Sequence, residues 1–324
     1  MKKESLWKTC SVVVLLCAMT VVMNSSQTKA AEDYPSKPIE FVVGWSPGGG
    51  TDALARIVTD KINKYTEGKA KMFVTNKPGS SGVVGLNYAV KAKPDGYTLA
   101  SVHGSNTYIA FLFPENTPYT MDSFETVCNI TRSLYVLCVR DESPFKNCEQ
   151  LMEYARKNPG SLTCASLGKT SSANVYFELL KLKEKVDIRT VPFTGAGPAT
   201  TAILGGHVDM TVTNDTSIAP HIKSGKIRVL LQFDETPRYP KVPTSKERGI
   251  EVPLAPNGCG VPAGLPRDRF KILCGLFERA MHDREVLDKL ESVGEIPSYL
   301  NSQEFKDFLV RGYKTVELVK DKLR

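Results

Sequence analysis

The sequence predicts an α/β protein with two lobes, each built on a mainly parallel sheet flanked by helices. Short apolar runs that fit strands alternate with longer runs of helical spacing through almost the whole chain. Two loops rich in glycine and hydroxyl side chains each follow a strand and precede a helix. The 324 residues are enough for two domains of ordinary size, each with a substantial core.

Residues 1–30 have the composition of a secretory signal peptide. Lysines precede an apolar run over residues 11–23 that is too short to cross a membrane, and small residues offer a cleavage site near Ala30. The alternatives are a retained anchor helix and lipid attachment at Cys17, although Leu16 stands where lipidation requires a small residue. We therefore expect cleavage near Ala30 and an exported, soluble chain.

The charge of the processed chain indicates its kind of partner. The first 30 residues contain four lysines and one glutamate, so their removal lowers the formal net charge from +7 to +4. The remaining sequence has no dense basic stretch with interleaved aromatic residues, so nucleic acid is not an expected partner. A small positive excess favours a small anionic ligand.

The cysteines give no metal-site pattern. None forms a C-x-x-C pair, and no histidine lies near one of them at ligand spacing. Export permits disulfides, but the spacing leaves their pairing open. The cysteines that follow residue 30 are Cys128, Cys138, Cys148, Cys164, Cys259 and Cys274. We expect neither a metal nor a cofactor.

The first glycine-rich loop lies in the stretch VVGWSPGGGTDALARIV, residues 42–58. It joins an apolar strand at 39–45 to a helix at 51–66. Glycine lets a ligand approach the free N–H groups at a helix N-terminus, which favour an anion. Thr51 can cap the helix or donate its hydroxyl to a ligand, and Asp52 is expected to accept first-turn N–H groups. The alternative is a turn that only connects the two elements.

Enzyme motifs are incomplete in this chain. Gly48, Gly50 and Ala53 match a dinucleotide-binding pattern, but Asn76 stands where that pattern expects an acidic residue at the end of the next strand. The sequence contains neither a P-loop nor a G-x-S-x-G motif. His103 follows a strand and could border a cleft, but the four histidines show no useful spacing to a nucleophile. We therefore expect a binding protein rather than an enzyme.

The second loop lies in CASLGKTSSANVYFELL, residues 164–180. A strand ends at Ala165 and a helix begins near Ser172, so the design repeats that of the first loop. The alternative is an ordinary capped helix. Two such loops, one in each lobe, could face each other across a cleft at the strand ends and hold one carboxylate or two.

The rest of the chain continues the alternation. Further strands are predicted at 71–75, 97–102, 124–130, 134–140, 162–165, 187–191, 208–212, 227–231 and 258–261. Further helices are predicted at 83–92, 147–157, 172–184, 196–205, 215–224, 267–281 and 302–321. The last helix has Ser302 as its capping residue and an apolar face that includes Phe305 and Leu309.

Seven motifs, in a fixed order, carry a resemblance to a known family. They are YPSKPIEFVVGWSPGGGTDALAR, NKPGSSGVVG, KPDGYTL, VPFTGAGPATTAILGGHVDMTVTN, HIKSGKIRVL, VPTSKERGI and GVPAGLP. With them, the chain resembles the extracytoplasmic solute-binding proteins of tripartite tricarboxylate transporters, also called the Bug family. The resemblance covers nearly the whole sequence after residue 30.

The resemblance implies a hinged, two-lobed fold of the periplasmic-binding-protein (Venus-flytrap) type that closes around a small solute. Lobe 1 would comprise residues 31–132 and 256–324, and lobe 2 residues 133–255. The protein would be a periplasmic monomer that binds a small-molecule carboxylate and delivers it to integral-membrane transporter subunits. The alternatives are a ligand-binding sensor for a membrane signalling receptor and an exported α/β enzyme.

The resemblance also implies which residues hold the carboxylate, through backbone N–H groups, hydroxyls and bridging waters. The first loop would contribute Trp45, Ser46, Gly49, Gly50, Thr51 and Asp52. The second loop would contribute Ser166, Lys169, Thr170, Ser171 and Ser172. Three further segments would contribute Ser105 and Asn106, Thr194 and Gly195, and Thr213 and Asn214.

The sequence departs from the family pattern at two positions. Asn174 stands where the family often has a histidine, and Thr213 where it often has an aspartate. A neutral Thr213 leaves no counter-charge for an amine, so we expect an anionic carboxylate rather than an amino acid. Lys169 could pair with a second carboxyl group or lie solvated on the surface. Trp45 could stack on an aromatic ligand or simply pack, so the choice among mono-, di-, tri- and aromatic carboxylates stays open.

Overall fold

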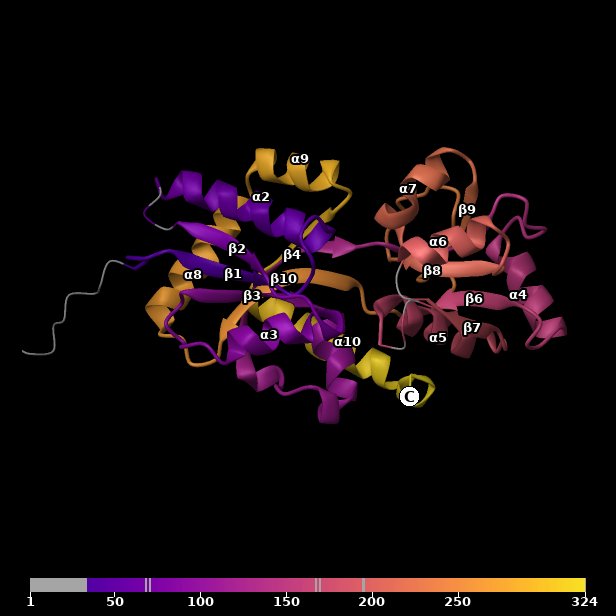
Figure 1. Ribbon diagram of the computed structural model, residues 1–324, viewed down its shortest axis with the longest axis horizontal. Coiled ribbons are helices and arrows are strands. Elements are labelled where there is room, and N and C mark those ends of the chain that lie inside the picture. Colours follow the sequence, from indigo (N-terminus) through magenta and orange to yellow (C-terminus); the bar gives the residue numbers. More distant parts are fainter. Residues whose placement is uncertain are drawn as a thin grey trace, which may run out of the picture.

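The computed structural model describes residues 34–67, 69, 71–166, 168, 170–193 and 196–323. The predicted signal peptide, Lys169, Thr194 and Gly195 lie outside the described residues. The described chain forms two bodies that lie side by side, each with its own sheet (Figure 1). We call the body with the first sheet lobe 1 and the other lobe 2. Within the described ranges, no helix has the length and apolar character needed to span a bilayer.

Lobe 1 contains a six-stranded sheet in the order β11-β4-β10-β3-β1-β2. Its strands are β1 (Ile39–Val43), β2 (Met72–Asn76), β3 (Thr98–His103), β4 (Phe124–Ser133), β10 (Ala255–Pro262) and β11 (Ile296–Leu300). Its helices are α2 (Gly50–Tyr65), α3 (Val83–Val90), α8 (Arg267–Met281), α9 (Arg284–Ser292) and α10 (Ser302–Glu317). A π-helical turn (Ser105–Ile109) follows β3.

Lobe 2 contains a five-stranded sheet in the order β7-β6-β8-β5-β9. Its strands are β5 (Tyr135–Arg140), β6 (Thr163–Ser166), β7 (Arg189–Pro192), β8 (Met210–Asn214) and β9 (Ile227–Phe233). Its helices are α4 (Cys148–Lys157), α5 (Ser172–Glu184), α6 (Ala196–Leu204) and α7 (Asp215–Lys223).

The predicted fold class of two lobes, each with a sheet flanked by helices, is confirmed, but both sheets are mixed rather than mainly parallel. β1 pairs in parallel with β2 and β3, and β6 with β7 and β8. The strands next to the interlobe crossings, which are β4, β5, β9 and β10, make only antiparallel pairs. An apolar run predicts a strand but carries no information on its direction, so the sequence could not show this.

Most predicted elements are present, with ends that differ by a few residues. Two elements of lobe 1, α9 and β11, were not predicted. β11 is an edge strand whose sequence, IPSYL, contains a proline, and proline weakens the strand pattern. The last helix ends at Glu317 instead of residue 321.

Each lobe has an apolar core built from the inward faces of strands and helices. In lobe 1, Phe41 of β1 packs with Leu54 and Val58 of α2, and its ring lies 6.1 Å from that of Phe277 on α8. All four side chains are at most 1% exposed. Burial of each such side chain stabilises the fold by about 1.5–3 kcal/mol. This packing fixes α2, and with it the first loop, to the sheet.

Two buried tyrosines hold the segment that returns the chain from lobe 2 to lobe 1. Tyr176 of α5 donates a hydrogen bond to the carbonyl of Pro253 (2.5 Å), and Tyr108 of lobe 1 donates one to the carbonyl of Leu254 (3.1 Å). An ion pair joins Arg132, at the first crossing, to Asp234 of lobe 2, just after β9. The chain therefore passes between the lobes twice. The two hydrogen bonds and the ion pair hold the lobes together at the same junction.

The six cysteines among the described residues are free thiols. Cys128 and Cys259 lie opposite each other on β4 and β10, with their sulfur atoms 3.9 Å apart. Five of the six are buried and act as small apolar side chains.

Candidate functional site

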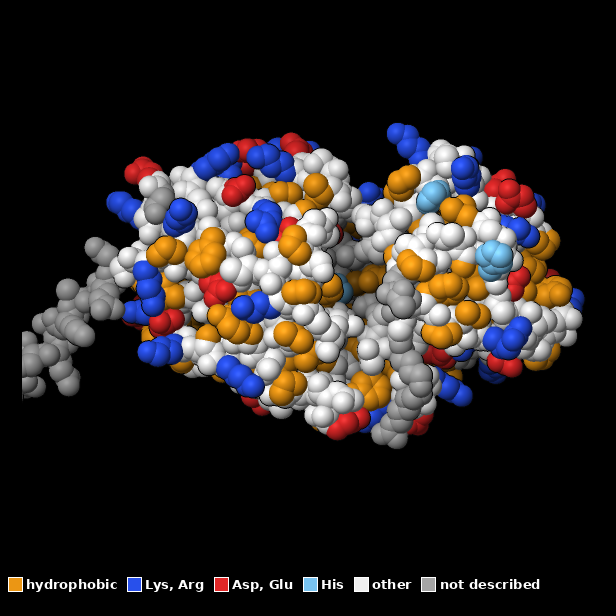
Figure 2. Space-filling view, viewed as in Figure 1, with side chains coloured by type: hydrophobic (Ala, Val, Ile, Leu, Met, Phe, Trp, Pro, Cys, Tyr) orange, Lys and Arg blue, Asp and Glu red, His pale blue; other side chains and the backbone are white. Residues whose placement is uncertain are grey.

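The strand ends of both sheets meet at the junction of the lobes. β1, β2 and β3 are parallel, and their carboxyl ends lie at the edge where β10 begins, because Asn257 pairs with His103. β4 ends at the same edge and continues into β5, whose first residue, Tyr135, pairs with Asn214 at the end of β8. Figure 2 shows the surface hollowed between the lobes. Open α/β sheets bind ligands at such an edge.

The first predicted loop lies at this edge and presents free N–H groups. Gly49 is the N-cap of α2 and no side chain caps the helix. The first intrahelical bond runs from the N–H of Ala53 to the carbonyl of Gly49. The N–H groups of residues 49–52 therefore have no acceptor among the described residues, and residues 46–50 are exposed. This arrangement is suited to an anion.

Asp52 stabilises the first loop from behind. Its carboxylate accepts hydrogen bonds from the N–H of Gly48 (3.0 Å), from Nε and Nη2 of Arg56 (3.0 Å each) and from Nδ2 of Asn76 (2.9 Å). Burial opposes its ionisation, but these hydrogen bonds together outweigh burial and lower the pKa of Asp52 to about 2. The predicted first-turn acceptor thus binds the N–H group that precedes the helix. Asn76, which stands where the dinucleotide-binding pattern expects an acidic residue, donates one of these hydrogen bonds.

Thr51 does not cap α2, although a cap was one of its two predicted roles. Its hydroxyl donates to Oδ1 of Asn257 on β10 (3.4 Å). Asn257 in turn donates to Ser133 (3.0 Å) and Glu295 (3.3 Å). Thr51 therefore connects the first loop to the end of the sheet.

The segment after β3 supports the first loop. The ring of Trp45 lies 5.0 Å from that of His103, whose Nδ1 lies 3.0 Å from the hydroxyl of Ser105. Burial lowers the pKa of His103 to about 4, so the ring is neutral at neutral pH. Asn106 is fully buried, and its amide bonds the N–H of His103 (2.8 Å) and the carbonyl of Ser101 (3.1 Å). Asn106 thus holds the backbone, and the hydroxyl of Ser105 donates to the carbonyl of Ser81 (3.1 Å).

The second predicted loop is also a helix start, but here a side chain caps the helix. Ser171 is the N-cap of α5 and accepts a hydrogen bond from the N–H of Asn174 (3.2 Å). Ser166, the last residue of β6, donates to Oδ1 of Asn174 (3.1 Å). Thr170 is exposed and Ser172 is buried. Asn174, in the place of the family's histidine, therefore links the strand end to the helix start.

The end of β8 provides a buried hydroxyl without a partner. Oγ1 of Thr213 is buried and has no hydrogen-bond partner among the described residues. Asn214 is the N-cap of α7, and its Oδ1 accepts hydrogen bonds from the N–H (2.9 Å) and hydroxyl (2.5 Å) of Thr216. Of the two predicted residues, Thr213 has a buried hydroxyl without a partner and Asn214 caps a helix.

Two buried carboxyl groups at the junction were not predicted. Glu295 precedes β11 in lobe 1, and Asp215 begins α7 in lobe 2. Burial raises the pKa of both groups, and the like charge of Asp215 raises the pKa of Glu295 further. Arg238 lies 3.4 Å from Oδ2 of Asp215 and donates to the carbonyl of Gly294 (3.1 Å). Glu295 lies in no recognisable motif, and no sequence signal could have placed it beside α2.

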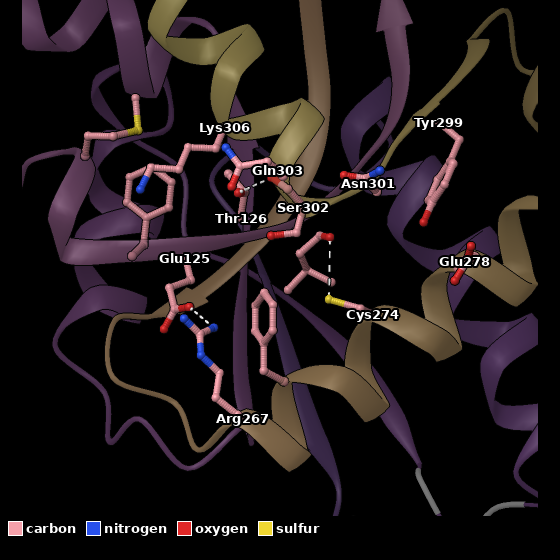
Figure 3. Close-up of a pocket in the computed structure, with 14 residues that line it drawn as sticks. Glu125, Thr126, Arg267, Cys274, Glu278, Tyr299, Asn301, Ser302, Gln303 and Lys306 are labelled. Carbon is pink, nitrogen blue, oxygen red and sulfur yellow. Dashed lines mark hydrogen bonds and ion pairs between the residues drawn. The ribbon is translucent and has the colours of Figure 1, made fainter.

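A separate cavity of about 470 Å³ lies at the opposite end of lobe 1 (Figure 3). Glu125 and Thr126 at the start of β4 line it, and so does Arg267 just after β10, so the full length of both strands separates it from the junction. The ion pair of Arg267 with Glu125 (2.6 Å) already neutralises two of its charges. We therefore take the junction as the candidate site.

Comparisons with known proteins agree on one family. The model of the tripartite tricarboxylate transporter family receptor matches residues 54–321. A relative from Cupriavidus necator, the UPF0065 protein in the gbd 5' region, is 32% identical over 299 residues, which are 90% of this chain and 89% of that protein.

Solved structures give the same result. A TctC solute-binding protein from Polaromonas is 25% identical, with a TM-score of 0.78 over 89% of this chain and 99% of that one. MatC from Rhodopseudomonas palustris, solved with bound malate, is 26% identical, with a TM-score of 0.71 over 90% of this chain and 100% of that one. The predicted family is confirmed.

Proposed function

Because the chain belongs to the tripartite tricarboxylate transporter receptor family, we propose that it captures a small organic carboxylate between its lobes and delivers it to membrane transporter subunits. The observation that carries this proposal is the pair of helix starts at the junction. α2 from lobe 1 and α5 from lobe 2 both begin in small, polar loops at the facing strand ends. The malate in the MatC structure supports a carboxylate as the ligand class.

The ligand would be held by both lobes at once. From lobe 1, the N–H groups of residues 49–51 and the hydroxyl of Ser46 would bind a carboxylate, with Trp45 and Ser105 beside them. From lobe 2, Ser166, Thr170, Ser171, Ser172 and Thr213 supply hydroxyls and helix N–H groups. Asp52, Asn106 and Asn214 would shape the site without touching the ligand. Lys169, Thr194 and Gly195 stay predictions.

Binding would close the lobes about the two crossings. We place lobe 1 at residues 31–132 and 256–324 and lobe 2 at residues 133–255, with hinges near 132 and 255. A ligand that contacts both lobes binds the closed form more tightly, and it shifts the population only by that difference in affinity. The closed form would then dock on the membrane subunits, and no covalent bond of the ligand would change.

The proposal includes a cellular location and a partner. We propose a monomeric protein in the periplasm, exported with cleavage near Ala30. A sensor that signals to a membrane receptor would use the same binding step. Loss of carboxylate uptake on deletion of the gene, with the signalling output intact, would support the transporter.

The ligand class is tested by a thermal-shift screen with mono-, di- and tricarboxylates, aromatic carboxylates and amino acids. A ligand at about 100 times its dissociation constant stabilises the folded protein by about 2.7 kcal/mol. We expect a rise in melting temperature with at least one carboxylate. A rise with amino acids alone would contradict the argument from Thr213, and no rise with any carboxylate would contradict the proposed function.

The position of the site is tested by Gly50→Val. A Cβ at Gly50 would lie 2.5 Å from Oε1 of Glu295 and would obstruct the approach to α2, so we expect at least a tenfold loss of carboxylate affinity by calorimetry. Gly275→Val on α8 is the matched control, because a Cβ there meets no atom of the described residues within 4 Å. Equal affinities in the two variants would place the anion site elsewhere.

A further inference from the structure

Glu295 is a buried carboxyl group at the N-terminus of α2. It is 6% exposed, and its Oε2 accepts hydrogen bonds from Oγ1 of Thr131 (2.7 Å) and Nδ2 of Asn257 (3.3 Å). Its Oε1 accepts no hydrogen bond from the described residues and would lie 2.5 Å from a Cβ on Gly50. Glu295 therefore lies against the first turn whose N–H groups would receive a ligand carboxylate.

The surrounding charges do not neutralise Glu295. The cation that faces it is Arg238 of lobe 2, but this guanidinium is shared with Asp215 and with the carbonyl of Gly294. Asp215 itself is 2% exposed, and its Oδ1 has no partner among the described residues. One arginine thus faces two buried carboxyl groups, one from each lobe.

The remaining charged groups near Glu295 are engaged elsewhere or have the same sign. Arg132 pairs with Asp234 across the crossings, and Arg56 of α2 pairs with Asp52. Glu291 of α9 is exposed and lines an opening of about 470 Å³ that Glu295 also lines. This opening gives Glu295 a path for a proton from solvent.

An anionic ligand at α2 would bring another negative charge close to Glu295. Two carboxylates that share a site cannot both stay ionised at low cost, and one of them retains a proton. A protonated carboxyl group is a donor and makes a short, charge-assisted hydrogen bond to a carboxylate. The same residue would therefore repel the ligand when ionised and bind it when neutral.

We propose that Glu295 takes up one proton when an anionic carboxylate binds beside α2, and that the resulting O–H donates to the ligand. The proton would be carried on Oε1, because Oε2 already accepts two hydrogen bonds. The inference rests on the proposed function and adds its regulation by pH. Burial raises the pKa of Glu295 and so lowers the free-energy cost of taking up this proton when the ligand binds.

The test is isothermal titration calorimetry of the full processed chain with malate and succinate between about pH 7 and 8, where both probes are almost completely ionised. Each pH is measured in two buffers of different ionisation enthalpy, which counts the protons taken up. We expect uptake of about one proton, and an affinity that falls up to tenfold per pH unit above the pKa of Glu295. Glu295→Gln keeps a donor and removes the charge, so it should bind with no proton uptake and with pH-independent affinity.

Glu291→Gln serves as the control. It removes an exposed charge from the same opening and should keep the proton uptake of the wild-type protein. Binding without proton uptake in the wild-type protein, or uptake that persists in Glu295→Gln, would overturn the inference and leave the proposed function intact. No binding of any carboxylate at any pH would overturn both.

Discussion

Single residues hold the first loop in the shape that leaves its N–H groups free. Asp52 gathers the N–H of Gly48, the guanidinium of Arg56 and the amide of Asn76 around one buried carboxylate. The sequence predicted that Asp52 accepts first-turn N–H groups, and the N–H that it accepts is that of Gly48, just before the helix. The sequence could not indicate the partners, because Arg56 and Asn76 reach Asp52 only through the folding of α2 and the neighbouring strand.

Asp52→Asn tests this role. The variant loses the ion pair and at least one hydrogen bond, so we expect the free energy of unfolding at pH 7 to fall by about 1–2 kcal/mol. Because the pKa of Asp52 is lowered in the folded state, its stabilisation is present above about pH 3.8 and is lost as the pH falls to about 2. Urea unfolding should therefore show a wild-type advantage at pH 7 that shrinks in acid.

Asp60→Asn on the exposed face of the same helix is the control for this prediction. It should change the free energy of unfolding by less than about 0.5 kcal/mol. A wild-type advantage over Asp52→Asn that does not depend on pH would mean that packing, and not the charge of Asp52, stabilises the loop.

At the scale of elements, the spacing of apolar residues predicted most strands and helices. The glycines and hydroxyl side chains of the two loops predicted where α2 and α5 begin. α5 begins at Ser172 as predicted, and Ser171 caps it. The same spacing did not predict β11, which is an edge strand with a proline, or α9, which is a short helix next to a longer one. It also gave no strand directions, since these follow from how the chain crosses between lobes.

The capped start of α5 makes a prediction for both stability and binding. Ser171→Ala removes the acceptor for the N–H of Asn174, and we expect a loss of about 1 kcal/mol in the free energy of unfolding. Because this cap also shapes the second loop, carboxylate affinity should fall several-fold in calorimetry. Asn147→Ala removes the equivalent cap of α4, which accepts from the N–H of Gln150 (2.9 Å). It should lose similar stability and keep its affinity, and equal affinity losses in the two variants would contradict a role for α5 in the site.

At the scale of the whole molecule, the site is assembled from parts that are distant in the sequence. The two loops could be recognised because each carries its own glycines and hydroxyls. Glu295 and Asp215 could not, because they lie beside the site only after the chain has crossed twice between the lobes. The expectation of an anionic carboxylate rather than an amino acid rested on Thr213 alone. The two buried carboxyl groups at the same junction were not predicted. Glu295 would set the pH dependence of binding at the proposed anion site.

Trp45 offers the most direct test that a carboxylate binds at the first loop. The sequence contains two tryptophans, Trp7 in the predicted signal peptide and Trp45 in the loop, so the processed chain would report fluorescence from the site alone. Titration with the carboxylate that stabilises the protein most should change this emission saturably, with the dissociation constant found by calorimetry. Gly50→Val should move the midpoint of this change to an at least tenfold higher ligand concentration. Tight binding by calorimetry that leaves the emission of Trp45 unaltered, and that Gly50→Val does not weaken, would contradict the central claim.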